Sequence, residues 1–366
     1  MIVTNSLTDY LSLLNSFVPR ELIAESEWRK FNHIGNILPS ALTTFFGFES
    51  RLGIPEAHGD FLICADAHEA GRRVLAANSY DIDLPTELLH HPVWMNIRKF
   101  STNWESEASP LYDKITNVWL EFDVGNETKD LPVPSCFFGP KNLYNTPAVD
   151  SEHPYKWIWE NALPLLLGRS FPKSVENNIV KCFAALPENA YVFQVGLMLA
   201  REWDGVRLCI RNISPEKIID YLKSLDWQGD LNNLQLQLNN ISPLVDRIDL
   251  DIDVTEGLGD KIGLECYLNK QPQFEKRWSL FLDNLLLKGL CFPKKQQALL
   301  TYPGYIQEKM NPSLWPLSLR KISKILGDSY EWVIFKGIHH IKLNYCDAEI
   351  KEAKAYLYVS RSLIRG

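Results

Sequence analysis

The amino-acid sequence predicts an α+β fold in which five units, each of the order helix, strand, strand, helix, form an antiparallel ten-stranded barrel with an outer helical layer. Residues 247–254 alternate apolar and charged side chains, three of which are aspartates, and residues 261–268 again alternate apolar with polar ones. This pattern is typical of paired strands with one buried and one polar face. Similar pairs recur along the chain with helical patterns between them. Because a closed sheet leaves no unpaired edge, the repetition favours a ring whose polar faces line a lumen.

The first helical pattern runs from about Ser6 to Phe31 and is interrupted near Pro19, since leucines recur there at helical spacing. The first hairpin is expected to pair residues 44–52 with residues 60–64. Pairs of helices are expected between the next hairpins: 67–78 and 85–100 before a hairpin at 118–139, 154–167 and 173–186 before one at 191–211, and 215–225 and 231–240 before the one at 247–268.

The C-terminal third continues the same order. Residues 273–288 carry an apolar stripe at helical spacing, and residues 317–326 form a second amphipathic pattern. Four prolines between these two segments predict a loop. The fifth hairpin is expected over 337–359, where one face is aliphatic and the other carries histidine, lysine, asparagine and tyrosine.

Composition bounds the class of protein and its partners. The 366 residues, 46% hydrophobic and 23% charged, can bury a large core, and the repeated units favour a single domain over 1–366. A formal net charge of −7 without a long basic run argues against a general nucleic-acid binder. The N-terminus lacks a secretory pattern, and no window has the apolar length of a membrane span. We expect a cytoplasmic protein that binds neither nucleic acid nor membrane; its oligomeric state is not predicted.

Patterns for binding a metal are weak. Seven cysteines are an odd number and never form Cys-x-x-Cys, which argues against a disulfide framework and a thiolate zinc site. Asp249, Asp251 and Asp253 lie on one strand, where alternate residues are roughly 7 Å apart, too far to share one ion unaided. The adjacent His339 and His340 are expected to diverge on a strand. We therefore assign no metal ligands and expect the aspartates to form a cation-balancing wall or a hydrated face.

The last strand pattern, Lys354-Ala-Tyr-Leu-Tyr358, alternates basic and phenolic side chains on its polar face, with Lys342 on the neighbouring strand. Together with the order of elements along roughly the whole chain, this segment resembles the αββα barrel of the aromatic and peptide prenyltransferases. In that family the lumen binds an allylic diphosphate through lysine, arginine and tyrosine, and an aromatic or other nucleophile attacks the allylic carbon. The resemblance implies transfer of an isoprenyl group to an aromatic small molecule or a peptide side chain. It leaves magnesium dependence open.

The resemblance also implies a set of residues that bind the diphosphate. Ammonium groups and phenolic hydroxyls can stabilise the negative charge that develops as a diphosphate leaves. The alternative is that these residues are solvent-facing positions of an open sheet. The substrate-binding candidates are Arg207, Arg211, Lys342, Lys354, Tyr356 and Tyr358.

Two acids are candidates for the catalytic carboxylate. Glu49, in Gly47-Phe-Glu-Ser-Arg51, resembles the acid that several family members carry on an early strand to orient or deprotonate the nucleophile. Glu121 is an equal candidate, and burial beside Trp119 would raise its pKa and make it a better base near neutral pH. Trp119 is also a candidate cation–π wall for an allylic carbocation. Both acids could instead lie on a hydrated face.

A reading from another functional class stays open. A noncatalytic protein for peptide binding or peptide maturation could use the same polar lumen as a receptor, since an acidic lumen suits a cationic peptide better than an anionic diphosphate. The two hypotheses differ in whether acidic and basic clusters segregate within one cavity.

Overall fold

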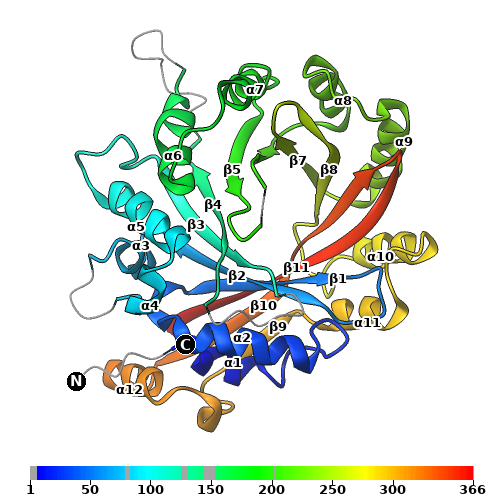
Figure 1. Ribbon diagram of the computed structural model, residues 1–366. Coiled ribbons are helices and arrows are strands. Elements are labelled where there is room, and N and C mark those ends of the chain that lie inside the picture. The colour runs from blue at the N-terminus through cyan, green and yellow to red at the C-terminus, as the bar shows by residue number, and fades with distance from the viewer. Residues whose placement is uncertain (1–5, 79–82, 125–130, 143–152, 202, 366) are drawn as a thin grey trace.

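Ten strands close into an antiparallel barrel, as the sequence predicts (Figure 1). The computed structural model describes residues 6–78, 83–124, 131–142, 153–201 and 203–365. Neighbours around the ring follow the chain from β1 to β8, then β10 and β11, and β11 pairs with both β10 and β1. The strands are β1 (Phe45–Arg51), β2 (Gly59–Asp66), β3 (Ile115–Phe122), β4 (Ser135–Pro140), β5 (Tyr191–Leu197), β6 (Val206–Arg211), β7 (Arg247–Val254), β8 (Leu258–Tyr267), β10 (Tyr330–Cys346) and β11 (Glu349–Arg365).

Helices surround the strands and cover the outer face of the barrel (Figure 1). A π-helical turn at Ile158–Ala162 leads directly into α6. The helices are α1 (Thr8–Leu14), α2 (Glu25–Ile37), α3 (Ala70–Leu75), α4 (Thr86–Leu89), α5 (Pro92–Glu105), α6 (Leu163–Leu167), α7 (Lys173–Ala184), α8 (Pro215–Ser224), α9 (Leu231–Ile241), α10 (Arg277–Leu287), α11 (Pro293–Thr301) and α12 (Leu317–Leu326), with 3-10 turns at Ser40–Leu42, Ser242–Leu244 and Pro312–Leu314.

The hydrophobic core lies between the outer face of the barrel and these helices. Leu250 and Ile252 of β7 and Leu264 of β8 are fully buried and belong to the same apolar cluster as Trp278 and Phe281 of α10. Burying a large apolar side chain stabilises the fold by roughly 1.5–3 kcal/mol. The aliphatic faces of the strands therefore hold the helical layer in place, and the polar faces remain for the interior.

Two local predictions are wrong in part. The N-terminal helical segment is interrupted around Pro19 as predicted, since α1 ends at Leu14 and α2 begins at Glu25, but α2 continues to Ile37 instead of ending near Phe31. The proline-rich segment contains α11, because Pro293 occupies the first helical turn, where its missing N–H needs no partner. It also contains β9 (Gly304–Gln307), an extra strand that pairs with residues 333–336 of β10 outside the ring.

The fifth hairpin is longer than predicted. β10 and β11 each span 17 residues, and β10 begins at Tyr330 instead of Gly337. The two halves of β10 use different neighbours: residues 341–345 pair with β8 in the barrel, and the N-terminal half pairs with β9. Within the described ranges, no helix combines the length and the apolar character that a membrane span requires.

Candidate active site in the barrel lumen

The interior of the barrel holds a cavity of about 250 Å³ whose wall divides into two arcs. We call the contiguous strands β11 and β1 to β5 the aromatic arc, and β6 to β8 with β10 the charged arc. The aromatic arc also contributes Glu121 and Tyr356 to the cavity. Its large rings at the cavity include Phe45, Trp119, Phe137, Phe193 and Tyr358. The ionisable side chains from the charged arc are Arg207, Cys209, Arg211, Glu265, Tyr267, His339, His340 and Lys342.

Rings on the aromatic arc contact one another across strand boundaries. Phe45 stacks on Tyr358 with ring centroids 5.8 Å apart, because β1 pairs with β11. Phe45 also meets Trp119 of β3 edge to face at 5.6 Å. The Arg211 guanidinium of the charged arc lies 3.8 Å from the centre of the Phe193 ring, where the two arcs meet. One side of the cavity is therefore suited to an apolar or aromatic ligand.

Each cation that the charged arc contributes to the cavity has an aspartate partner on β7. Arg207 donates to Asp253 over 2.8 Å and 3.0 Å, since the two residues are register neighbours on β6 and β7. Arg211 donates to Asp249 over 2.8 Å, and Lys342 forms an ion pair with the third aspartate, Asp251. The three aspartates thus contact three different cations. Of the two arrangements expected for these aspartates, a cation-balancing wall and a hydrated face, the structure shows the first.

Burial and these partners act in opposite directions on the aspartates. Burial raises the pKa of Asp249 to about 6 against the charges of Arg211 and Arg247. Burial also acts to raise the pKa of Asp253, but the hydrogen bond and the charge of Arg207 hold this pKa below its usual value. Burial and the nearby Glu265 charge raise the pKa of Asp251. The wall therefore carries carboxylates of different basicity within one strand.

Gly263 of β8 leaves the space in which Lys342 reaches Asp251. A Cβ atom at this position would lie 2.8 Å from the Lys342 Cε atom and 2.9 Å from the Asp251 Cβ atom. Both distances are too short for carbon atoms in contact. A side chain at residue 263 would therefore push the lysine away from its partner.

Three acids of the aromatic arc differ in their access to a cation. Glu49 accepts one hydrogen bond of 2.6 Å from the Tyr356 hydroxyl, and its other oxygen lies 2.6 Å from the Lys354 ammonium. Against the effect of burial, the charge and hydrogen bond of Lys354 lower the pKa of Glu49 to about 2. Burial and the Glu49 charge raise the pKa of Asp60 to about 8 and that of Glu121 to about 7. Glu121 thus faces the cavity with a pKa near neutrality.

The structure brings seven of the nine candidate site residues to the cavity. Glu49 and Lys354 do not line it; they pair with each other, and Glu49 contacts the cavity wall through the Tyr356 hydroxyl. The candidates at the cavity are Trp119, Glu121, Arg207, Arg211, Lys342, Tyr356 and Tyr358.

A histidine pair at the cavity corrects a prediction. His339 and His340 do not diverge, because a register shift in β10 between Ile338 and His340 turns both rings to the lumen. Their Nδ1 atoms are 2.8 Å apart, and the His340 ring stacks on Tyr356 with centroids 4.3 Å apart. Burial lowers the pKa of His339 to about 4 and that of His340 well below its usual value, so both rings are neutral at pH 7.

Sequence reasoning also missed Phe45, Phe137 and Phe193 as cavity residues. Phe45 and Phe137 neighbour other phenylalanines in their strands, so the apolar pattern carries no signal for which ring faces inward. The alternation over residues 261–268 puts Glu265 and Tyr267 on the polar face of their strand, so this pattern could have identified them as cavity residues.

Comparisons with known proteins rest on structure, since no family model and no curated protein matches this sequence. One similar solved structure is the apo form of the prenyltransferase PriB, 13% identical, with a TM-score of 0.48 over 96% of this chain and 94% of that chain. Another is AnaPT from Neosartorya fischeri, 12% identical, with a TM-score of 0.47 over 99% of this chain and 93% of that chain. The strand pairing of this chain itself establishes the barrel.

Proposed function

We propose that the protein transfers an allylic isoprenyl group from a diphosphate to an aromatic small molecule or a peptide side chain. The observation that carries the proposal is the division of one cavity into an aromatic arc and a charged arc. An isoprenyl diphosphate has the matching division, an apolar chain joined to an anionic head. Its chain would lie along Phe45, Trp119 and Tyr358, where ring faces stabilise positive charge on the allylic carbon.

The diphosphate head would bind at the charged arc. Arg207, Arg211 and Lys342 provide the positive charge, and Tyr356, whose hydroxyl donates to Glu49, lines the same cavity. A diphosphate would take over hydrogen bonds that the β7 aspartates now accept. Asp249 can release Arg211 by taking up a proton, since burial has already raised its pKa to about 6. The cations would then stabilise the charge that develops on the leaving oxygen.

Glu121 is the proposed base. A carboxylate with a pKa of about 7 can accept the proton that the nucleophile loses and can be ionised at neutral pH. In the reaction, the bond between the allylic carbon and the diphosphate oxygen breaks, the bond to the nucleophile forms, and the proton passes to Glu121. Glu49 is ionised by its contacts with Lys354 and Tyr356, and we assign it the role of positioning Tyr356.

The proposal is tested by binding and single-turnover transfer measured side by side. Dimethylallyl, geranyl and farnesyl diphosphates are titrated with and without magnesium, and transfer is followed with a panel of aromatic and peptide acceptors. Glu121→Gln should leave donor affinity within a factor of about two, lower transfer by about 10²-fold or more, and remove the rise of the rate through pH 7. Glu176→Gln on the outer helix α7 is the matched control. Unchanged transfer in Glu121→Gln would reject Glu121 as the base.

A noncatalytic peptide receptor is the second candidate, and the ion pairs between the cations of the charged arc and the β7 aspartates favour it. An anionic ligand must compete there with Asp249, Asp251 and Asp253, whereas a cationic peptide can use the acids that line the cavity, Glu121 and Glu265. Failure to bind any of the three diphosphates, together with tight binding of an arginine- or lysine-containing peptide, would select this function over transfer.

A further inference from the structure

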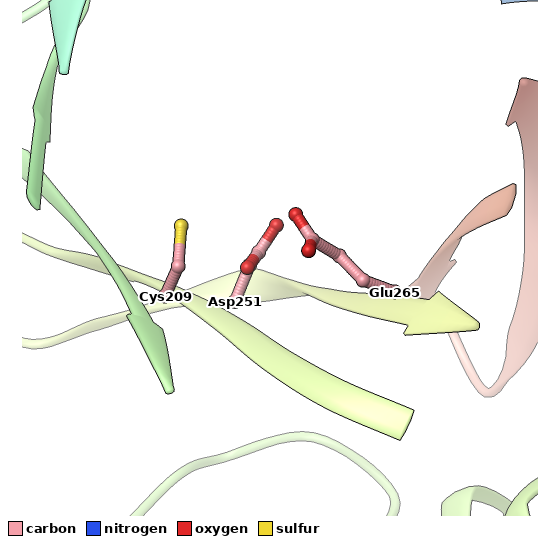
Figure 2. A group of neighbouring side chains, drawn as sticks. All are labelled: Cys209, Asp251 and Glu265. Atoms are coloured by element: carbon pink, nitrogen blue, oxygen red, sulfur yellow. The ribbon is translucent and has the colours of Figure 1, made fainter. Parts of the chain in front are cut away.

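Three potential metal ligands converge on one point of the charged arc. Cys209 of β6, Asp251 of β7 and Glu265 of β8 come from adjacent strands, and their side chains rise to the same side (Figure 2). Each offers a ligand atom, and these atoms all lie within 4.8 Å of one another. All three residues are buried. The thiol and the two carboxylates therefore share a small volume at the wall of the lumen.

A fourth side chain, His340, lies beside Glu265, and one of its two ring nitrogens has no hydrogen-bond partner. His340 is 5% exposed, and its buried Nε2 atom makes no hydrogen bond. This atom lies 3.7 Å from a Glu265 carboxylate oxygen. Asp251 is 2% exposed, and its Oδ1 atom likewise has no hydrogen-bond partner. Buried polar atoms normally find partners, so unpaired atoms of acceptor chemistry in one place indicate a ligand with positive charge.

The other polar atoms of Asp251, Glu265 and His340 contact residues outside this group. Lys342 forms an ion pair with Asp251 through Oδ2, and Tyr267 donates a 2.6 Å hydrogen bond to Glu265 Oε2. The His340 Nδ1 atom lies 2.8 Å from the Nδ1 atom of His339. When His340 donates in that contact, its Nε2 atom carries the lone pair that a metal requires. Such outer contacts orient the ligands of metal sites in proteins.

We propose that Cys209, Asp251, Glu265 and His340 bind one divalent transition-metal ion of the zinc class. One sulfur, one nitrogen and two carboxylate oxygens form the mixed ligand set that zinc and cobalt accept, whereas magnesium prefers oxygen alone. Binding draws the ligand atoms to about 2.0–2.3 Å from the ion, and the Cys209 thiol releases its proton to solvent as the sulfur–metal bond forms. This inference does not depend on isoprenyl transfer.

Cobalt(II) is the probe, because a thiolate bound to cobalt gives a charge-transfer absorption in the near ultraviolet. The metal-free full chain is titrated with Co²⁺ alone, and Zn²⁺ is then added to displace it. We expect one equivalent of Co²⁺ to produce the thiolate band and one equivalent of Zn²⁺ to remove it. Cys209→Ser should abolish the band, and Tyr267→Phe, which loses an outer contact, should weaken Co²⁺ binding by about 10–100-fold.

Cys346→Ser is the matched control, since Cys346 is the half-exposed thiol at the end of β10 and lies outside the cluster. It should keep the full band. Glu265→Gln, which preserves the side-chain shape, should also weaken Co²⁺ binding, and circular dichroism checks that each variant is folded. A folded wild-type chain that shows no thiolate band, or a band that persists in Cys209→Ser and disappears in Cys346→Ser, would overturn the proposal.

Discussion

The two arcs of the barrel wall neutralise their acids in different ways. On the charged arc, Arg207, Arg211 and Lys342 each contact a separate aspartate. On the aromatic arc, Glu49 takes the Lys354 ammonium, and the described residues include no ion pair of Asp60 or Glu121. All of these acids are lumen-side residues of similar chemistry, and they differ mainly in their partners.

This difference sets the protonation state of each acid. With its ammonium partner, Glu49 has a pKa of about 2, whereas Asp60 and Glu121 have values of about 8 and 7. Since desolvation raises the pKa of all three, the local supply of cations decides which acid is ionised. The aromatic arc consequently holds protons at neutral pH that could serve in acid or base chemistry.

The largest loss of stability is expected from removing the Lys354 ammonium that pairs with Glu49. Lys354→Met would leave a carboxylate that is 1% exposed without its counter-ion, and breaking such a buried pair costs about 3–5 kcal/mol of the free energy of unfolding. Urea unfolding at pH 7 measures the loss. Combining Lys354→Met with Glu49→Gln should recover a large part of it. If the single variant is as stable as the wild type, Glu49 does not depend on Lys354.

Asp60→Asn should change the free energy of unfolding by a smaller amount, and this change should depend on pH. The folded-state pKa of Asp60 is raised from 3.8 to about 8, so between these values the folded chain holds a proton that the unfolded chain has lost. The wild-type residue thus lowers the free energy of unfolding increasingly as pH rises through this window. The stability of Asp60→Asn relative to wild type should increase by on the order of 2 kcal/mol between pH 5 and pH 7. A pH-independent difference would show that Asp60 is ionised in the folded chain.

The smallest of the three changes in stability is expected from a substitution on the charged arc. Arg207→Met removes the bidentate partner of Asp253, but that aspartate is 20% exposed and can regain water. We expect a loss of about 1–2 kcal/mol in the free energy of unfolding. Lys181→Met on the outer helix α7, whose partner Asp226 is 79% exposed, should leave the melting temperature unchanged. A loss as large as that of Lys354→Met would remove the distinction between the two arcs.

The sequence by itself determined which faces of the strands are polar and in what order the units follow. Residues 247–254 and 261–268 show why: alternation with a period of two is a local property, and it separates Leu250 and Leu264 from Asp251 and Glu265 without knowledge of the rest of the chain. The same alternation placed Glu121, Lys342 and Tyr356 on polar faces.

Only the tertiary structure decided which polar residues meet. Closure of the ring pairs β11 with β1 and sets Tyr356 opposite Glu49, 307 residues apart in the sequence. A register shift in β10 turns both His339 and His340 inward, and nothing in the local pattern marks it. The cluster of Cys209, Asp251 and Glu265 likewise requires three strands in register. Register and closure depend on pairing between distant segments, whereas periodicity reports only on neighbours along the chain.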